Sequence, residues 1–125
     1  MGKPNILIVE DDSDLRYLYT YVLFSGFEVR TAENGVDALT EVLSRKPDII
    51  ITDIDLPILD GIKFIQIVKR DAECATVPII VISGASQEFM AEASDAGAAK
   101  VMPKPIDPTL LLDELLQMLP EVSSH

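Results

Sequence analysis

The chain has 125 residues, 48% of them hydrophobic and 25% charged, which fits one globular domain with a core of its own. Ten basic residues against 21 acidic ones give a net charge of −11. This charge argues against direct binding to nucleic acid, which depends on neutralising phosphates with Lys and Arg, and it is compatible with a bound cation or a basic partner surface.

Five apolar runs predict five β-strands. Residues 6–9 and 49–51 do not alternate apolar with polar side chains, which is typical of strands covered on both faces in a parallel sheet. Residues 27–32 alternate, which predicts a strand with one wetter face at the edge of the sheet. Pro78 lies near the start of the fourth run, where its missing N–H matters least. The expected strands cover residues 6–9, 27–32, 49–51, 77–82 and 100–102.

A helical pattern of apolar side chains follows each predicted strand. Asn34-Gly35 is a turn signal before the second helix, and Pro108 suits the first position of the fifth. Gly26 and Gly97 suit the ends of the first and fourth helices. The expected N-caps are Asp12 or Ser13, Asp60, Ser86 and Asp107. The side chains expected to face the core are Leu15, Leu18, Tyr19, Val22, Val36, Leu39, Val42, Leu43, Ile62, Ile65, Val68, Phe89, Met90, Ala93, Ala96, Leu111, Leu112, Leu115 and Leu119.

The strict alternation of strand and helix predicts an α/β fold. Five such units imply a doubly wound parallel sheet with right-handed crossovers and helices on both faces. No second composition regime, internal repeat or low-complexity tract appears, so we expect a single domain over residues 1–125 with a core from 5 to 119.

Cysteine content and hydropathy bear on the compartment. Cys74 is the single cysteine, so an internal disulfide is impossible and a reducing compartment fits. No apolar run reaches membrane-spanning length, and the amino terminus has no secretory apolar region. We therefore expect a cytoplasmic protein without a membrane partner.

Polar side chains follow four of the predicted strands at the point where each ends. Because the carboxyl ends of parallel strands share one edge of the sheet, we expect these side chains to converge in a shallow cleft. Each also has a plainer reading, such as a helix cap for Asp12, a turn residue for Ser83 and a solvated cation for Lys104. The residues concerned are Asp11, Asp12, Asp53, Ser83 and Lys104.

Three carboxylates in one cleft favour a bound cation. Two unit charges about 4 Å apart repel by roughly 4 kcal/mol at an effective dielectric near 20. A cluster of Asp11, Asp12 and Asp53 should therefore hold either protons or a divalent cation. Oxygen ligands with room for water suit Mg²⁺, or Mn²⁺, better than zinc.

The same cleft suits phosphoryl chemistry. A carboxylate such as that of Asp53 can attack phosphorus and form an aspartyl-phosphate. A metal ion, the ammonium of Lys104 and the hydroxyl of Ser83 would then bind the phosphoryl oxygens.

From Ile6 to Leu119 the chain resembles the receiver domain of two-component response regulators. The residues that carry the resemblance are Glu10-Asp11-Asp12, Asp53 with Leu56-Pro57 and Asp60-Gly61, Ser83-Gly84-Ala85, and Lys104-Pro105. The resemblance implies a flavodoxin-like sheet with strand order 2-1-3-4-5. It also implies a phosphoacceptor signalling domain, which assists its own phosphorylation and dephosphorylation, rather than an enzyme. We expect no output domain within these residues.

The resemblance also implies roles for particular residues. Asp53 would accept a phosphoryl group from a histidine kinase or a histidine phosphotransfer protein, and this would switch a surface that binds a downstream target or a missing output domain. Asp11, Asp12 and Asp53, with the backbone carbonyl of Asp55, would hold Mg²⁺. Ser83 and Lys104 would bind the phosphoryl oxygens, and the Lys104-Pro105 bond is often cis in such domains.

One position departs from the family pattern. Receivers usually carry Tyr or Phe three residues before the lysine, and that ring swings inward on phosphorylation, whereas this chain has Val101. A valine cannot make that swing, so we expect switching to rely on Ser83 and on the loop after the fourth strand. Asp55 and Ala85 flank the site and are expected to tune dephosphorylation.

Three other functions are compatible with parts of the pattern. Asp53-Ile54-Asp55 is similar to the paired aspartates of haloacid-dehalogenase-type phosphatases, but Pro57 stands where that family has Thr or Val. An interaction module that is never phosphorylated would keep the fold, and Val101 favours it. A flavodoxin-like cofactor protein fits the fold alone, yet the acids after the first strand would repel a flavin phosphate.

Overall fold

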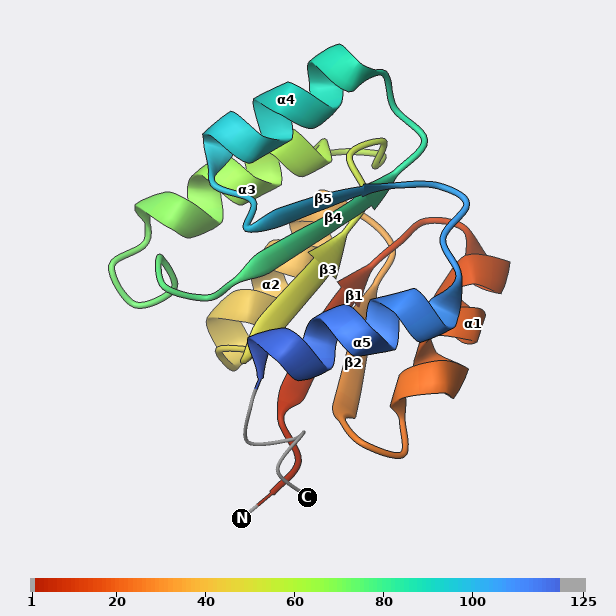
Figure 1. Cartoon of the computed structure of the whole chain (residues 1–125). Helices are drawn as coiled ribbons and strands as arrows, with labels where there is room; N and C mark the ends of the chain where they lie inside the picture. The colour runs from red at the N-terminus through yellow and green to blue at the C-terminus, as the bar shows by residue number, and fades with distance from the viewer. Residues whose placement is uncertain (1, 120–125) are drawn as a thin grey trace.

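The computed structural model describes residues 2–119 and contains five strand–helix units in one parallel sheet of order β2-β1-β3-β4-β5 (Figure 1). The predicted fold class and strand order are confirmed. The elements in chain order are β1 (Asn5–Val9), α1 (Ser13–Leu23), β2 (Glu28–Ala32), α2 (Gly35–Ser44), β3 (Ile49–Thr52), α3 (Gly61–Arg70), β4 (Ile79–Ser83), α4 (Gln87–Ala96), β5 (Lys100–Pro103) and α5 (Pro108–Met118).

The three central strands are buried along their whole length. Every residue of β1, β3 and β4 is buried, as the unbroken apolar runs predict. The edge strands β2 and β5 contain exposed and half-buried residues, and the predicted edge position of β2 is confirmed. Hydrophobic runs therefore mark the centre of the sheet, and the carboxyl ends of its strands lie along one edge.

Two separate cores lie on the two faces of the sheet. Helices α1 and α5 cover one face, and α2, α3 and α4 cover the other (Figure 1). Successive side chains of a strand point to opposite faces, so Ile50 packs with Phe64 in one core while Ile49 and Ile51 pack with Leu111 in the other. Each fully buried isoleucine contributes roughly 1.5–3 kcal/mol of transfer free energy, which ties both helical layers to the same strand.

The helix starts follow the predicted caps. Asp60, Ser86 and Asp107 cap α3, α4 and α5, and Asp12 rather than Ser13 caps α1. The predicted turn residue Asn34 in fact caps α2, accepting the Asp37 N–H at 2.8 Å.

Two helix ends were predicted, and one prediction was wrong. Gly97 ends α4 with a φ of 125°, a conformation that favours glycine. Helix α1 instead ends at Leu23 with Phe24 as its C-cap, and Gly26 follows in the turn without a positive φ.

Some predicted core positions are exposed. The side chains of Val36, Leu43 and Phe89 are 46%, 70% and 50% exposed, whereas the unpredicted Ala38 is fully buried. Helix α2 lies so close to the β3–α3 loop that a β-carbon on Gly35 would overlap the backbone of Leu59. No helix within residues 2–119 is long and apolar enough to cross a membrane.

Candidate functional site

Asp53 lies directly after β3 and its side chain is almost fully buried. Its backbone N–H donates to the Val9 carbonyl at 3.1 Å, which extends the β1–β3 pairing by one residue. One carboxylate oxygen, Oδ1, accepts the N–H of Ile54 at 2.6 Å and the N–H of Asp55 at 3.2 Å. The turn after the strand therefore fixes the orientation of this carboxylate, which is 6% exposed.

Lys104 approaches Asp53 from the end of β5. Its Nζ donates to Oδ2 of Asp53 and to Oε1 of Glu10, both at 2.7 Å. The Lys104 backbone N–H donates to the carbonyl of Ser83 at 2.9 Å, and the Lys104–Pro105 peptide bond is cis, as the family resemblance implies. Lys104 thus joins the ends of β1, β3 and β4.

The charges of this group shift one another's protonation. Burial alone would lower the pKa of Lys104, but its hydrogen bonds to Asp53 and Glu10 outweigh burial and raise that pKa above its usual range. Burial raises the pKa of Glu10, and the hydrogen bond from Lys104 opposes this rise without cancelling it. The ammonium of Lys104 therefore stays protonated at any physiological pH.

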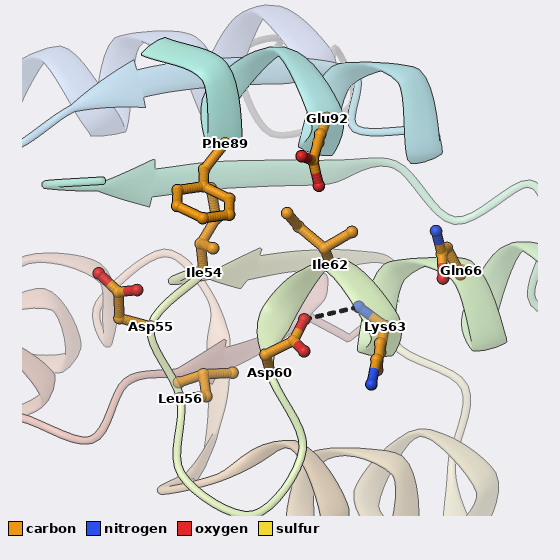
Figure 2. A pocket seen from close by; sticks show the side chains of 9 residues that line it. All are labelled: Ile54, Asp55, Leu56, Asp60, Ile62, Lys63, Gln66, Phe89 and Glu92. Atoms are coloured by element: carbon orange, nitrogen blue, oxygen red, sulfur yellow. Dashed lines mark hydrogen bonds between the residues drawn. The ribbon is translucent and has the colours of Figure 1, made fainter. Parts of the chain in front are cut away.

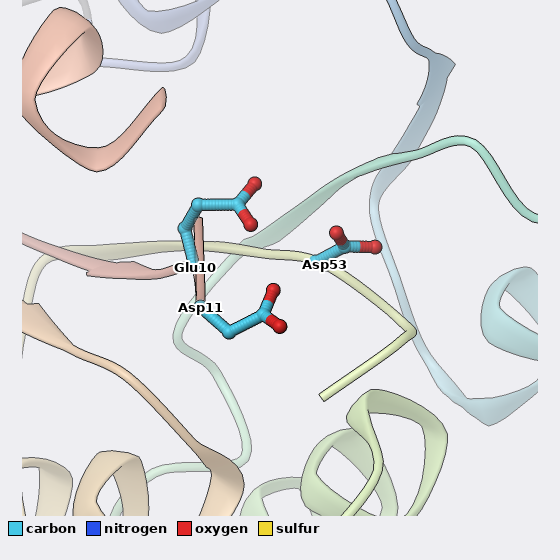
Figure 3. Close-up of side chains that lie close together, drawn as sticks. All are labelled: Glu10, Asp11 and Asp53. Carbon is cyan, nitrogen blue, oxygen red and sulfur yellow. The ribbon is translucent and has the colours of Figure 1, made fainter. Parts of the chain in front are cut away.

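Three carboxylates gather at this edge of the sheet. One oxygen each from Glu10, Asp11 and Asp53 lies within 4.8 Å of the others (Figure 3). Glu10 and Asp53 are buried, whereas Asp11 is exposed. The two buried members, Glu10 and Asp53, are paired with Lys104, and Asp11 is the member open to solvent.

Asp12 serves as the predicted helix cap, and Glu10, for which no role was predicted, lies in the carboxylate cluster. Oδ1 of Asp12 accepts the N–H groups of Asp14 at 2.9 Å and Leu15 at 3.1 Å, so this side chain caps α1 and is not a member of the carboxylate cluster. The ligand role predicted for Asp12 is thus not reflected in the cluster, where Glu10 stands instead. The sequence placed Glu10 at the same edge of the sheet, because it follows the first strand and precedes Asp11. Nothing in the sequence indicated that Glu10 would bind Lys104.

The remaining predicted residues lie around the same edge. Ser83 ends β4 fully buried, and its Oγ accepts the N–H of Ala85 at 3.2 Å, which leaves its hydroxyl hydrogen for another acceptor. The side chain of Asp55 is exposed. Val101 is half-buried and packs against the core beneath α2, α3 and α4.

The donor set fits a hard divalent cation. The cluster offers carboxylate oxygens only, and one ammonium offsets only part of three negative charges. Oxygen ligands at a partly open site are those that Mg²⁺ and Mn²⁺ prefer. The site combines an oriented carboxylate, a fixed cation, a hydroxyl and a cluster of possible metal ligands, which are the groups that stabilise a transferring phosphoryl group.

Comparison with known proteins identifies the family. The model of the response regulator receiver domain matches residues 6–116, and the chain belongs to this family of signalling domains. It is 42% identical over 103 residues to the KDP operon transcriptional regulatory protein KdpE of Escherichia coli, covering 81% of this chain and 44% of that protein. It is 35% identical over 86 residues to the sensor histidine kinase TmoS of Ectopseudomonas mendocina, covering 69% of this chain and 9% of the kinase.

A solved structure shows the same fold. The chemotaxis response regulator CheY4 of Vibrio cholerae superposes with a TM-score of 0.86 at 29% identity, covering 93% of this chain and 98% of that one. The chain spans less than half the length of the two curated relatives, which differ from each other in their overall roles.

Proposed function

We propose that Asp53 accepts a phosphoryl group from a phosphohistidine of a histidine kinase or phosphotransfer protein, and that this modification alters a surface that binds a partner. The observation that carries the proposal is the double anchoring of the Asp53 carboxylate. Two backbone N–H groups hold Oδ1, and the ammonium of Lys104 holds Oδ2. A carboxylate fixed in this way presents a lone pair in a defined direction, which lowers the entropic part of the barrier to attack.

The transfer itself is a substitution at phosphorus. A bond forms between a carboxylate oxygen of Asp53 and the phosphorus atom, and the bond from phosphorus to the donor nitrogen breaks. The histidine nitrogen leaves with the electron pair. Lys104, now beside an uncharged acyl oxygen, would bind a phosphoryl oxygen, and the hydroxyl of Ser83 would donate to another.

A divalent cation completes the charge balance. We infer that Asp11, Asp12 and Asp53, with the backbone carbonyl of Asp55, hold Mg²⁺ or Mn²⁺, and that Glu10 lies next to it. Asp12 would contribute through Oδ2, because its Oδ1 caps α1. When bound, the cation would supply positive charge beside the oxygens of the incoming phosphoryl group.

The consequence of phosphorylation would be a change in the loop after β4. Ser83 is the residue of this loop that would bond to the phosphoryl group, and its hydroxyl now accepts the N–H of Ala85. Redirecting that hydroxyl would move the Ser83–Ala85 turn and the start of α4. Val101 would take no part as a moving ring, so the signal would pass through the backbone of this loop to a downstream protein or to a further domain of a longer chain.

A small phosphodonor with Mg²⁺ tests the proposal. The wild type should gain the mass of one phosphoryl group, and Asp53→Asn should gain none. Asp113→Asn is the matched control, because the side chain of Asp113 is exposed on α5 and has no assigned role. An adduct on Asp53→Asn, or equal loss in both variants, would overturn the proposal.

A second function shares the fold. A receiver that is never phosphorylated would act only as an interaction module, and Val101 in the usual aromatic position favours it. No adduct on the wild type, from a small donor or from any histidine kinase, would support this second function.

A further inference from the structure

A groove outside the carboxylate cluster lies between the loop after β3 and the helices α3 and α4. Its volume is about 560 Å³, within the range of roughly 300–1,000 Å³ for protein binding pockets. Ile54 and Ile62 form its apolar floor, and the ring of Phe89 forms one wall (Figure 2). Phe89 is 50% exposed, although the apolar spacing of α4 predicts it as a core residue.

Carboxylates surround this apolar surface. Asp55, Asp60 and Glu92 line the groove around Ile54, Ile62 and Phe89 (Figure 2). Asp60 accepts the N–H of Lys63 at 3.0 Å as the cap of α3. Among residues 2–119, neither Asp55 nor Glu92 forms an ion pair. Lys63 also borders the groove, but its ammonium end points away from Phe89 (Figure 2).

We propose that this groove binds a segment of a partner protein that carries an apolar side chain flanked by Lys or Arg. The apolar floor would take the apolar side chain, and the rim would pair with the basic ones. Nucleic acid and anionic lipid do not fit, because the rim would repel their phosphates. A small molecule fits less well, since the half-exposed ring of Phe89 leaves the groove open on one side and would not enclose a ligand.

The docking groove lies next to Asp53 without including it. Ile54 and Asp55 line the groove, and their N–H groups hold the Asp53 carboxylate. Docking does not require phosphorylation, because the groove is present in the unmodified chain. The unphosphorylated chain and its Asp53→Asn variant should therefore both bind. Failure of docking would leave the formation of the phosphoryl adduct untouched, and the two proposals fail separately.

An amphipathic peptide of leucine and lysine in helical spacing is the probe, and the same peptide with glutamate for lysine is its charge control. Backbone amide spectra of the whole chain should show shifts around the docking groove with the lysine peptide alone. Phe89→Ala should weaken binding by at least about fivefold, the effect of losing about 1 kcal/mol at an interface centre. Glu92→Lys should weaken it by a similar factor.

Two matched variants separate the groove from the rest of the surface. Phe24→Ala removes a similarly exposed ring, 58% against 50%, at the end of α1. Glu73→Lys makes the same charge reversal in the turn after α3. Both should bind the lysine peptide as the wild type does. The proposal is overturned if no peptide binds, if the glutamate peptide binds equally, if Phe24→Ala weakens binding more than Phe89→Ala, or if the shifts centre on the exposed Tyr17 and Tyr21 of α1.

Phe89→Leu tests whether the loss of peptide binding in Phe89→Ala reflects misfolding alone. It keeps an apolar wall, so binding should recover most of what Phe89→Ala loses. Spectra of the free variants with the wild-type dispersion would show that the fold is intact. A Phe89→Leu variant that binds no better than Phe89→Ala would count against an apolar contact at this position.

Discussion

Gly61 packs against the backbone of Asp53 so closely that a β-carbon on Gly61 would overlap the Asp53 carbonyl oxygen. The Gly61 N–H also donates to the carbonyl of Ile54 at 2.8 Å. The first residue of α3 is therefore held against the backbone of Asp53, the proposed phosphoryl acceptor. Glycine is needed at this position because a β-carbon would not fit. Its φ is not positive, so the conformational freedom of glycine is not the reason.

Gly61→Ala should lower the free energy of unfolding by about 1–3 kcal/mol, because the added methyl group must push the Asp53 backbone or the start of α3 aside. Urea denaturation measures this change. Gly26→Ala is the control, since its β-carbon would meet nothing within 4 Å, and it should leave stability unchanged or slightly raised. Equal destabilisation by both substitutions would contradict the steric argument.

Lys104→Met should remove the positive charge that Glu10 and Asp53 share. Two buried carboxylates are then left facing each other, and the free energy of unfolding should fall by roughly 2–3 kcal/mol. Magnesium should raise the melting temperature of Lys104→Met more than that of the wild type, because the cation takes over part of the missing charge. Thermal melts with and without the metal test both statements.

Lys100→Met is the matched control for this measurement. Lys100 pairs with Glu114 at 3.2 Å, but its side chain is 47% exposed, so its loss should cost less than about 1 kcal/mol. Its melting temperature should respond to magnesium as the wild type does. A magnesium effect of the same size in Lys104→Met and Lys100→Met would refute the assignment.

Ile58 has a left-handed backbone conformation, which suits asparagine or glycine better than isoleucine. Its φ is 71°, and its side chain is 80% exposed in the β3–α3 loop. A β-branched residue in this region costs roughly 1–2 kcal/mol, and no buried contact compensates. Ile58→Asn should therefore raise the free energy of unfolding by about 0.5–1 kcal/mol, whereas Ile58→Val should give no gain because it keeps the branched β-carbon. The comparison of the two variants by denaturation decides the point.

The buried thiol of Cys74 should make stability fall in alkaline solution. Burial raises the pKa of Cys74, with the nearby Asp71 acting in the same direction. The unfolded chain loses this proton near pH 8.5, while the folded chain keeps it to higher pH. The stabilisation is therefore complete below about pH 8.5 and is lost as pH rises through the folded pKa. Cys74→Ala should flatten the fall of unfolding free energy between pH 8 and 10, roughly, and an unchanged slope would show that other groups cause it.

Phosphorylation, or a phosphoryl mimic such as beryllofluoride, should shift the amide signals of residues 84–102. The reason is the bond proposed for the Ser83 hydroxyl, which would turn away from the Ala85 N–H. Ser83→Ala should still form the adduct but lose most of these shifts. Spectra of the free and modified forms without differences in this segment would exclude switching through the loop.

The sheet was predictable because its signal is local. The isoleucines of β3 are all buried, and three of them in a row leave no polar face for water, so the central position of β3 could be read directly. The signal that predicts the caps Asp60 and Ser86 is equally local, because each cap accepts the N–H group three residues ahead. The exposed faces of the helices were harder to predict. Leu43 and Phe89 are apolar but exposed, and the sequence of their own helices does not show which face the neighbouring loop or helix covers.

The site was predictable in outline only. Parallel topology brings Asp53 and Lys104 to one edge, and they are bonded there. The pairing of Lys104 with Glu10 joins residues 94 positions apart, and three acids in a row do not reveal which of them points inward. Asp12 is a good cap as well as a good ligand, so its residue type alone could not decide between these roles.

The span of the Lys104–Glu10 contact also bears on synthesis of the chain. Glu10 leaves the ribosome early, and its counter-charge follows only after nearly the whole sheet has been made. Until Lys104 emerges, the carboxylates of Glu10 and Asp53 lack the ammonium that pairs with them in the folded chain, so their burial is costly. Closure of this edge thus waits for the last strand, so a truncated chain lacking β5 should not bury these acids.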